Sequence, residues 1–85
     1  MAKFSIEIKK SAIKELNAIV KKDLKRILSK IRSLADDPRP MGCVRLSGQE
    51  RYRLRQGDYR ILYSVEDDVC VVYVVKIAHR KDVYR

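Results

Sequence analysis

The chain has 85 residues, of which 46% are hydrophobic, and this composition argues against disorder and favours one domain, residues 1–85, with a modest core. Its 20 lysines and arginines against 11 acids give a formal net charge of +9, which predicts a polyanionic partner such as a nucleic acid, an acidic protein segment or an anionic membrane surface. There is no signal-peptide pattern and no apolar run long enough to span a bilayer, so we expect a cytoplasmic protein without a membrane partner.

The N-terminal half predicts one strand followed by two helices. Residues 3–9 alternate between apolar and polar side chains, as in a half-buried strand. Ser11 can cap a short helix over 12–20, whose shared face holds Ile13, Leu16 and Val20. A second helix over 22–35 carries an apolar stripe of Leu24, Ile27, Leu28, Ile31, Leu34 and Ala35, and it ends at "DDPRP". Basic residues on the outer faces of this pair form either a solvated surface or a second phosphate-contacting face: 14, 21, 22, 25, 26, 30 and 32.

The C-terminal half predicts three consecutive strands, over 51–56, 59–66 and 69–78. Two dipeptides provide the turns between them, Gly57-Asp58 and Asp67-Asp68. The third strand, "VCVVYVVKIA", is apolar on both faces, as a central strand should be. We therefore expect an α+β fold, in which an N-terminal strand and a helical hairpin precede an antiparallel β-meander and one sheet packs on the helices.

The two cysteines and the few glycines limit the possible chemistry. Cys70 lies in an apolar run and is expected to be a small core residue, whereas Cys43 lies in a loop-like stretch and can be a free thiol; a disulfide between them is the alternative. Their spacing fits no zinc motif, no carboxylates have metal-ligand spacing, and three glycines make no phosphate-binding loop. We therefore expect no metal site and no cofactor, which disfavours a metal-dependent nuclease.

The first predicted hairpin, "YRLRQGDYRILY" at residues 52–63, carries arginines with no acid among them except in its turn. A two-residue loop pairs Gln56 with Tyr59 and places one set of side chains on the helix-facing side, namely Tyr52, Leu54, Ile61, Tyr63 and Val65. The opposite side holds four arginines, Arg51, Arg53, Arg55 and Arg60. Like charges opposite each other destabilise a sheet by up to about 1 kcal/mol. The pattern therefore favours a phosphate-binding face, for which the planar guanidinium is suited, over a plain solvated strand face.

The C-terminal "IAHRKDVYR" supplies the remaining candidates. His79, Arg80 and Tyr84 follow the central strand and can fold back over the sheet, and Lys81 adds a further phosphate contact. Such a set can cleave RNA without a metal. The 2′-hydroxyl attacks the adjacent phosphorus, arginines stabilise the developing charge, and titratable groups take and return the protons. A structural role for His79, and a core-closing role for Tyr84, are the alternatives.

Residues 44–85 resemble the RelE-type toxins of bacterial and archaeal toxin–antitoxin systems, which belong to the RelE/ParE superfamily. The similarity rests on the "L-x-G" step of Leu46 and Gly48, on "YRLRQGDYRILY", on the acidic turn before a valine-rich strand and on the closing "HRKDVYR"; residues 1–43 match in layout. The resemblance implies an mRNA endoribonuclease that acts in the ribosomal A site without a metal. It also implies a cognate RelB-like antitoxin, whose acidic or amphipathic segment wraps the sheet and helices.

The resemblance also implies roles for individual residues. Arg60 is expected to contact the phosphate, Arg80 to contact the phosphate or protonate the leaving group, and Arg53 and Arg55 to grip the substrate and stabilise charge. The best-known members have lysines at these last two positions, and both the hairpin and the stretch from Arg80 to Tyr84 are shorter here than in the best-known RelE toxin.

The general base has two candidates. Arginine stays protonated and cannot take a proton. The base is therefore expected to be Tyr84, because an arginine cluster favours its phenolate. His79 is the rival, because its ordinary pKa of about 6.5 already suits the task.

Two other functions fit the same sequence. ParE-type relatives poison DNA gyrase and lack the catalytic set, and a similar fold alone does not distinguish the two activities. A catalytically silent RNA-binding module is the second alternative. Ribosome-supported cleavage of mRNA separates the nuclease from the silent module, and inhibition of gyrase identifies the ParE-like activity.

Overall fold

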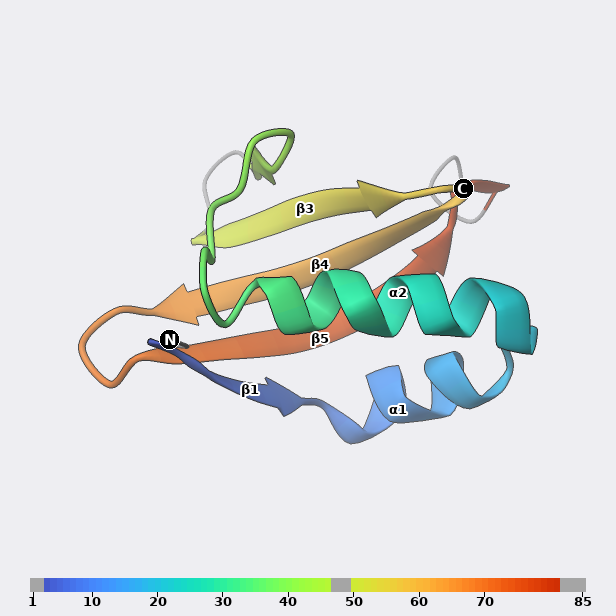
Figure 1. The fold of residues 1–85 in the computed structure, drawn as a ribbon, viewed down its shortest axis with the longest axis horizontal. Coiled ribbons are helices and arrows are strands. Elements are labelled where there is room, and N and C mark those ends of the chain that lie inside the picture. Colours follow the sequence, from blue (N-terminus) through green and yellow to red (C-terminus); the bar gives the residue numbers. More distant parts are fainter. Residues whose placement is uncertain (1–2, 47–49, 82–85) are drawn as a thin grey trace.

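A computed structural model describes residues 3–46 and 50–81 of the chain. Its elements follow the order β1 (Ser5–Ile8), α1 (Lys10–Asn17), α2 (Lys21–Ser33), β2 (Val44–Arg45), β3 (Arg51–Gln56), β4 (Tyr59–Glu66) and β5 (Val71–His79). The strands form one sheet in the order β1-β5-β4-β3-β2. β3, β4 and β5 make an antiparallel meander, to which β1 adds in parallel and the short β2 adds antiparallel. With the helices packed on this sheet (Figure 1), the predicted α+β fold is confirmed.

The core lies between the two helices and one face of the sheet. α1 contributes Ala12 and Leu16, and α2 contributes Ile27 and Ile31, which are almost fully buried. The strands contribute alternate residues where their pairing is regular, because successive side chains of a strand point to opposite faces. The β4–β5 pairing is irregular between Leu62 and Tyr63, and on β5 the alternation shifts there between Val74 and Ile77. The core residues of the strands are Leu54, Ile61, Tyr63, Val65, Val72, Val74 and Ile77. The core is therefore built from the stripe of α2 and the inner face of the hairpin that the sequence predicts.

The register of the β3–β4 hairpin agrees with the prediction pair by pair. Gln56 faces Tyr59 across the two-residue turn, and the following pairs are Arg55–Arg60, Leu54–Ile61, Arg53–Leu62 and Tyr52–Tyr63. Gly57 has a φ of +60°, a left-handed conformation that glycine adopts without steric cost. The turn therefore fixes which side chains reach the helices and which reach the opposite face.

The first helix differs from its prediction. It begins at Lys10 and ends at Asn17, and Ser11 lies inside it while Lys9 occupies the cap position without a side-chain hydrogen bond. Leu16 is buried as predicted, but Ile13 is 44% exposed and Val20 is 65% exposed, so the prediction is wrong for two of the three residues of this apolar face. The physical reason is length: two turns of helix bury only Ala12 and Leu16, and Val20 adopts an extended backbone as the cap of α2.

The turn before β5 also differs from its prediction. The strand starts at Val71 rather than at 69, because residues 67–70 form the turn. Cys70 has a φ of +54° and is exposed, so its predicted place in the core is wrong. Both Cys70 and Cys43 are free thiols rather than a disulfide.

Glu15 of α1 holds the edge of β5 beyond the end of β1, whose pairing stops at Ile8 and Val74. Its Oε1 accepts a hydrogen bond from the Ile77 N–H at 2.9 Å, and its Oε2 lies 2.9 Å from the Lys76 ammonium. The carboxylate therefore supplies the acceptor that a longer β1 would have provided.

We expect Glu15→Ala to lower the free energy of unfolding by about 1–3 kcal/mol, because it leaves the half-buried Ile77 N–H without a partner. Glu15→Gln keeps an acceptor oxygen and loses only a partly exposed ion pair, so it should cost less than about 1 kcal/mol. Urea denaturation of the three proteins measures both. Equal losses in the two variants would show that the ion pair, rather than the hydrogen bond to the strand, is what matters.

Arg39 ties the loop after α2 to the β4–β5 turn. Its guanidinium donates to both carboxylate oxygens of Asp67, at 3.1 and 2.7 Å, and its Nε donates to the Tyr52 hydroxyl at 2.8 Å. The hydrogen bonds from Arg39 hold the pKa of the Asp67 carboxyl below its ordinary value. The folded state therefore favours the ionised carboxylate.

A lowered folded-state pKa contributes stability above the unfolded-state pKa, and this contribution is lost as the pH falls through the folded-state value. We expect wild type to be more stable than Asp67→Asn above pH of about 5, and the difference to vanish as the pH falls below about 4. Urea denaturation across this range measures it. Asp68→Asn is the matched control, because Asp68 forms no ion pair within the described residues, and its difference from wild type should not follow the same curve.

Candidate nucleic-acid interface

The face of the sheet opposite the helices carries the arginines of the hairpin. Arg53 faces Leu62 on the neighbouring strand, and Arg55 faces Arg60. Since Leu54 and Ile61 between them are buried under the helices, these arginines lie on the other side. Among the described residues no helix covers that side. The structure therefore has the predicted arrangement of the hairpin, with apolar side chains on the helix side and arginines on the opposite side.

Three of these arginines form a cluster that has no acidic partner in the described part of the chain, and we call it the arginine cluster: Arg53, Arg55 and Arg60. The Arg55 Nε donates to the Gly57 carbonyl at 3.0 Å, which holds its guanidinium at the tip of the hairpin. Arg60 is half-buried, and its Nη1 is shielded from solvent and makes no hydrogen bond within the described residues. None of the three ion pairs found there includes these side chains. The cluster therefore offers uncompensated, partly fixed donors to an anion.

Arg51 has different surroundings from the cluster. It faces Ser64, and it lines a shallow hollow together with Glu50, Ser64 and Glu66. Two carboxyl groups at the same hollow weaken the local positive field. The structure therefore places Arg51 at the edge of the predicted phosphate-binding face, beside acids, and the unopposed charge lies with the arginine cluster.

Arg80 lies next to the hairpin tip. Its backbone N–H donates to the Asp58 carbonyl at 2.7 Å, and its Nε lies 3.8 Å from the Asp58 carboxylate. Ala78, two residues earlier, is the cross-strand partner of Arg60. The end of β5 is thus bound to the turn that separates Arg55 from Arg60, which brings Arg80 to the same end of the sheet. The sequence does not predict Asp58 as the anchor of Arg80, because the contact joins the hairpin turn to a residue far away in the chain.

His79 lies on the other side of the sheet from the arginine cluster. It pairs with Tyr59, and the two rings meet edge to face with centroids 5.1 Å apart. Tyr59 packs against the core under the helices, so the alternation of the strand places His79 on that side as well. Its Nδ1 accepts a hydrogen bond from the Lys81 N–H at 3.1 Å. The structure therefore does not bring His79 together with Arg60, and packing against Tyr59 is the role that its contacts support.

Two further predicted site residues lie near the C-terminal end. Lys81 is exposed at the end of the described chain, and Tyr84 lies outside the described residues. Within residues 3–46 and 50–81, no group of three or more His, Cys, Asp and Glu side chains is placed to hold a metal ion. No helix in the same part of the chain is long and apolar enough to cross a membrane.

Comparisons with known proteins agree with this architecture. Residues 6–84 match the family described as the ParE toxin of the type II toxin–antitoxin system, parDE. A protein of Methanocaldococcus jannaschii named "Putative toxin RelE1" is 32% identical over 87 aligned positions, which cover 98% of this chain and 97% of that protein. The chain therefore belongs to the ParE toxin family of the RelE/ParE superfamily and is a RelE-type toxin of a type II toxin–antitoxin system.

Solved structures give the same fold. A chain of the archaeal RelE–RelB complex from Pyrococcus horikoshii OT3 superimposes with a TM-score of 0.84 at 30% identity, covering 92% of this chain and 96% of that one. A mutant of the E. coli toxin RelE in the free state gives a TM-score of 0.76 at 27% identity, covering 99% and 92%.

Proposed function

We propose that this toxin is an endoribonuclease that cleaves mRNA on the ribosome without a metal ion and so inhibits translation. The observation that supports the proposal most is the arginine cluster: three arginines on the sheet face that no described helix covers, without an acidic partner among the described residues. Such a face costs stability through the Arg55–Arg60 pair, and binding of a phosphate offsets the repulsion.

In the proposed reaction the 2′-hydroxyl of the substrate attacks the adjacent phosphorus, and the bond to the 5′-oxygen of the next nucleotide breaks. The products are a 2′,3′-cyclic phosphate and a free 5′-hydroxyl. Arg60 donates to the phosphate oxygens on which negative charge develops. Arg53 and Arg55 hold the flanking backbone, and Arg80 stabilises the phosphate or the leaving oxygen.

The general base in this proposal is Tyr84. Arginines remain protonated, and His79 lies on the opposite side of the sheet from the cluster. A tyrosine near several guanidinium groups is favoured in its phenolate form, which can accept the proton of the 2′-hydroxyl. The assignment of Tyr84 rests on the sequence and on the resemblance to RelE-type toxins.

The partner that silences the toxin is proposed to be a cognate RelB-like antitoxin with an acidic or amphipathic segment. Several similar solved structures are RelE–RelB complexes, including those from Pyrococcus horikoshii and Methanococcus jannaschii. The net charge of +9 and the arginine cluster are complementary to an acidic chain. A cognate antitoxin that left the arginine cluster exposed in the complex would contradict this part of the proposal.

A ParE-like action on DNA gyrase is the second candidate, because the family that matches residues 6–84 is that of ParE toxins. Expression of the toxin in cells, followed by primer extension on cellular mRNA, separates the candidates. The nuclease predicts new mRNA ends at in-frame codon positions, which Arg60→Ala and Tyr84→Phe abolish. Growth arrest with inhibited gyrase and no new ends would identify the ParE-like action. RNA binding with neither effect would indicate a silent module.

A further inference from the structure

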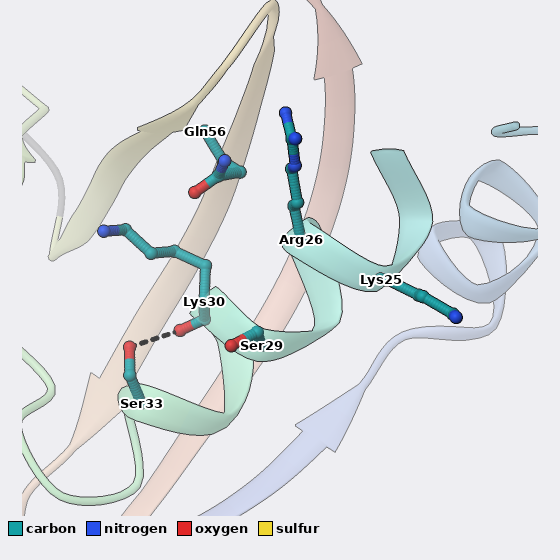
Figure 2. Close-up of a pocket in the computed structure, with 6 residues that line it drawn as sticks. All are labelled: Lys25, Arg26, Ser29, Lys30, Ser33 and Gln56. Atoms are coloured by element: carbon teal, nitrogen blue, oxygen red, sulfur yellow. Dashed lines mark hydrogen bonds between the residues drawn. The ribbon is translucent and has the colours of Figure 1, made fainter. Parts of the chain in front are cut away.

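A second basic surface lies on the helix side of the molecule, where α2 passes the end of β3. A groove of about 480 Å³ opens there between residues of α2 and the last residue of β3 (Figure 2), lined by Lys25, Arg26, Ser29, Lys30, Ser33 and Gln56. We call it the α2 groove. Three of its six lining residues are cations and none is an acid.

The cations of the α2 groove form no ion pair with any residue that the structure describes. The ion pairs among the described residues involve Arg39, Lys76 and Arg80, and none involves a cation of the groove. In Figure 2, Arg26 and Lys30 rise from α2 on either side of Gln56, whereas Lys25 points away from it. The adjoining hollow shares Arg26 and Gln56 with the groove, and its lining includes two acids, Asp23 and Asp58.

The spacing of the cations in the α2 groove suits a nucleic-acid backbone. Arg26 and Lys30 are one helical turn apart, about 6 Å along the axis, which is similar to the distance between neighbouring phosphates of an extended single strand. Ser29 lies between them and adds a hydroxyl, which is a common donor to phosphate oxygens. Hydroxyl and amide groups among cations are the pattern of a polar backbone contact rather than of an apolar protein interface.

The groove is also continuous with the arginine cluster around the edge of the sheet. Gln56 in the groove follows Arg55 in the cluster, and the two side chains lie on opposite faces of β3. β2 pairs only with Tyr52 and Arg53, so no described strand covers this end of β3. An RNA strand can therefore pass from one face to the other around that end.

We infer that the α2 groove binds the sugar–phosphate backbone of the RNA whose cleavage is proposed for the opposite face. The inference rests on the proposed function, because that function is the reason to choose RNA among the possible polyanions. It assigns the groove a role in affinity, not in chemistry: its residues extend the contact with the strand beyond the nucleotides held by the arginine cluster.

The test measures the affinity for a fluorescein-labelled 2′-O-methyl oligouridine, which lacks the attacking hydroxyl. Fluorescence anisotropy reports the binding, and the measurement is repeated over a range of salt concentrations. Removal of two phosphate contacts to a single strand lowers the slope of log affinity against log salt by about 1.4 and the affinity by about 10- to 30-fold in about 0.1 M salt. We expect this of Arg26→Gln/Lys30→Gln. The matched control is Lys10→Gln/Lys14→Gln, which removes two cations at the same spacing from α1 and should leave the slope unchanged.

Ser29→Glu is a second variant, which adds a negative charge to the groove at an exposed helix position without removing a cation. It should weaken RNA binding even if the double variant does not fold. Equal slopes in wild type and both groove variants would overturn the inference. If these variants instead lost affinity only for an acidic peptide, the groove would be a protein-binding site and the inference would also fail. Primer extension keeps the two proposals apart: in-frame cleavage with unchanged slopes would contradict the groove alone, and reduced slopes without cleavage would contradict the nuclease alone.

Discussion

Arg60→Ala is expected to lower the rate of mRNA cleavage by about 10²–10³-fold, because it removes a donor to the phosphate on which charge develops. Arg60 is the best candidate for this role because it is half-buried between strands and its Nη1 has no partner among the described residues. A side chain held in this way needs little reorganisation to meet a phosphate. Arg60→Lys should retain part of the activity, since it keeps the charge and loses the planar fork.

The free energy of unfolding of Arg60→Ala is the control for this prediction. If Arg60 had only a structural role, its replacement would lower this free energy. Arg60 faces Arg55, and removal of one member of a like-charged pair should leave the free energy of unfolding unchanged or raise it by up to about 1 kcal/mol. Arg32→Ala, at an exposed position near the end of α2, is the matched arginine variant and should cleave at the wild-type rate. Cleavage by Arg60→Ala within about threefold of wild type would contradict the assigned role.

Ile27→Ala is expected to have the largest effect on stability. Ile27 lies on α2 with no exposed surface, and deletion of a buried isoleucine side chain to alanine costs about 2–5 kcal/mol. A chain of this length has a total stability of about 4–13 kcal/mol, so the loss is a large part of it. Urea denaturation should show a lower midpoint with a similar slope.

Ile13→Ala is the matched control for Ile27→Ala, because it makes the same change in the neighbouring helix. Ile13 is 44% exposed, so the variant should lose less than about 1 kcal/mol. The sequence pattern alone places both isoleucines on helix faces directed at the core. Equal losses in the two variants would support that prediction and contradict the packing of α1 described here.

Local patterns determine most of this fold. The two-residue turn at Gly57 sets the register of the β3–β4 hairpin, so the faces of Leu54 and Arg55 follow from the sequence. The long apolar stripe likewise predicts α2 within two residues at each end, because thirteen residues present the stripe over several turns. Short elements carry weaker signals, and for this reason the prediction for the first helix was right for Leu16 and wrong for Ile13 and Val20.

The candidate site was only partly predictable, because it depends on pairings between distant segments. The position of His79 follows from the β4–β5 register, which shifts at an irregularity between Leu62 and Tyr63 that no sequence pattern indicates. The contact of Glu15 with β5 joins residues 62 positions apart. The α2 groove arises only when α2 is laid beside the end of β3. The arginine cluster, in contrast, lies within one hairpin and was visible in the sequence.

We propose above that this toxin cleaves mRNA through the 2′-hydroxyl of the substrate. The most direct test is incubation of the purified toxin with ribosomes that hold a defined mRNA, compared with the same mRNA carrying one 2′-deoxynucleotide at the cut position. We predict a single cut in the all-ribose mRNA, with a 2′,3′-cyclic phosphate and a 5′-hydroxyl as its ends, and no cut at that position in the deoxy-substituted mRNA. Cleavage of both mRNAs at the same position, or of neither, would contradict the account.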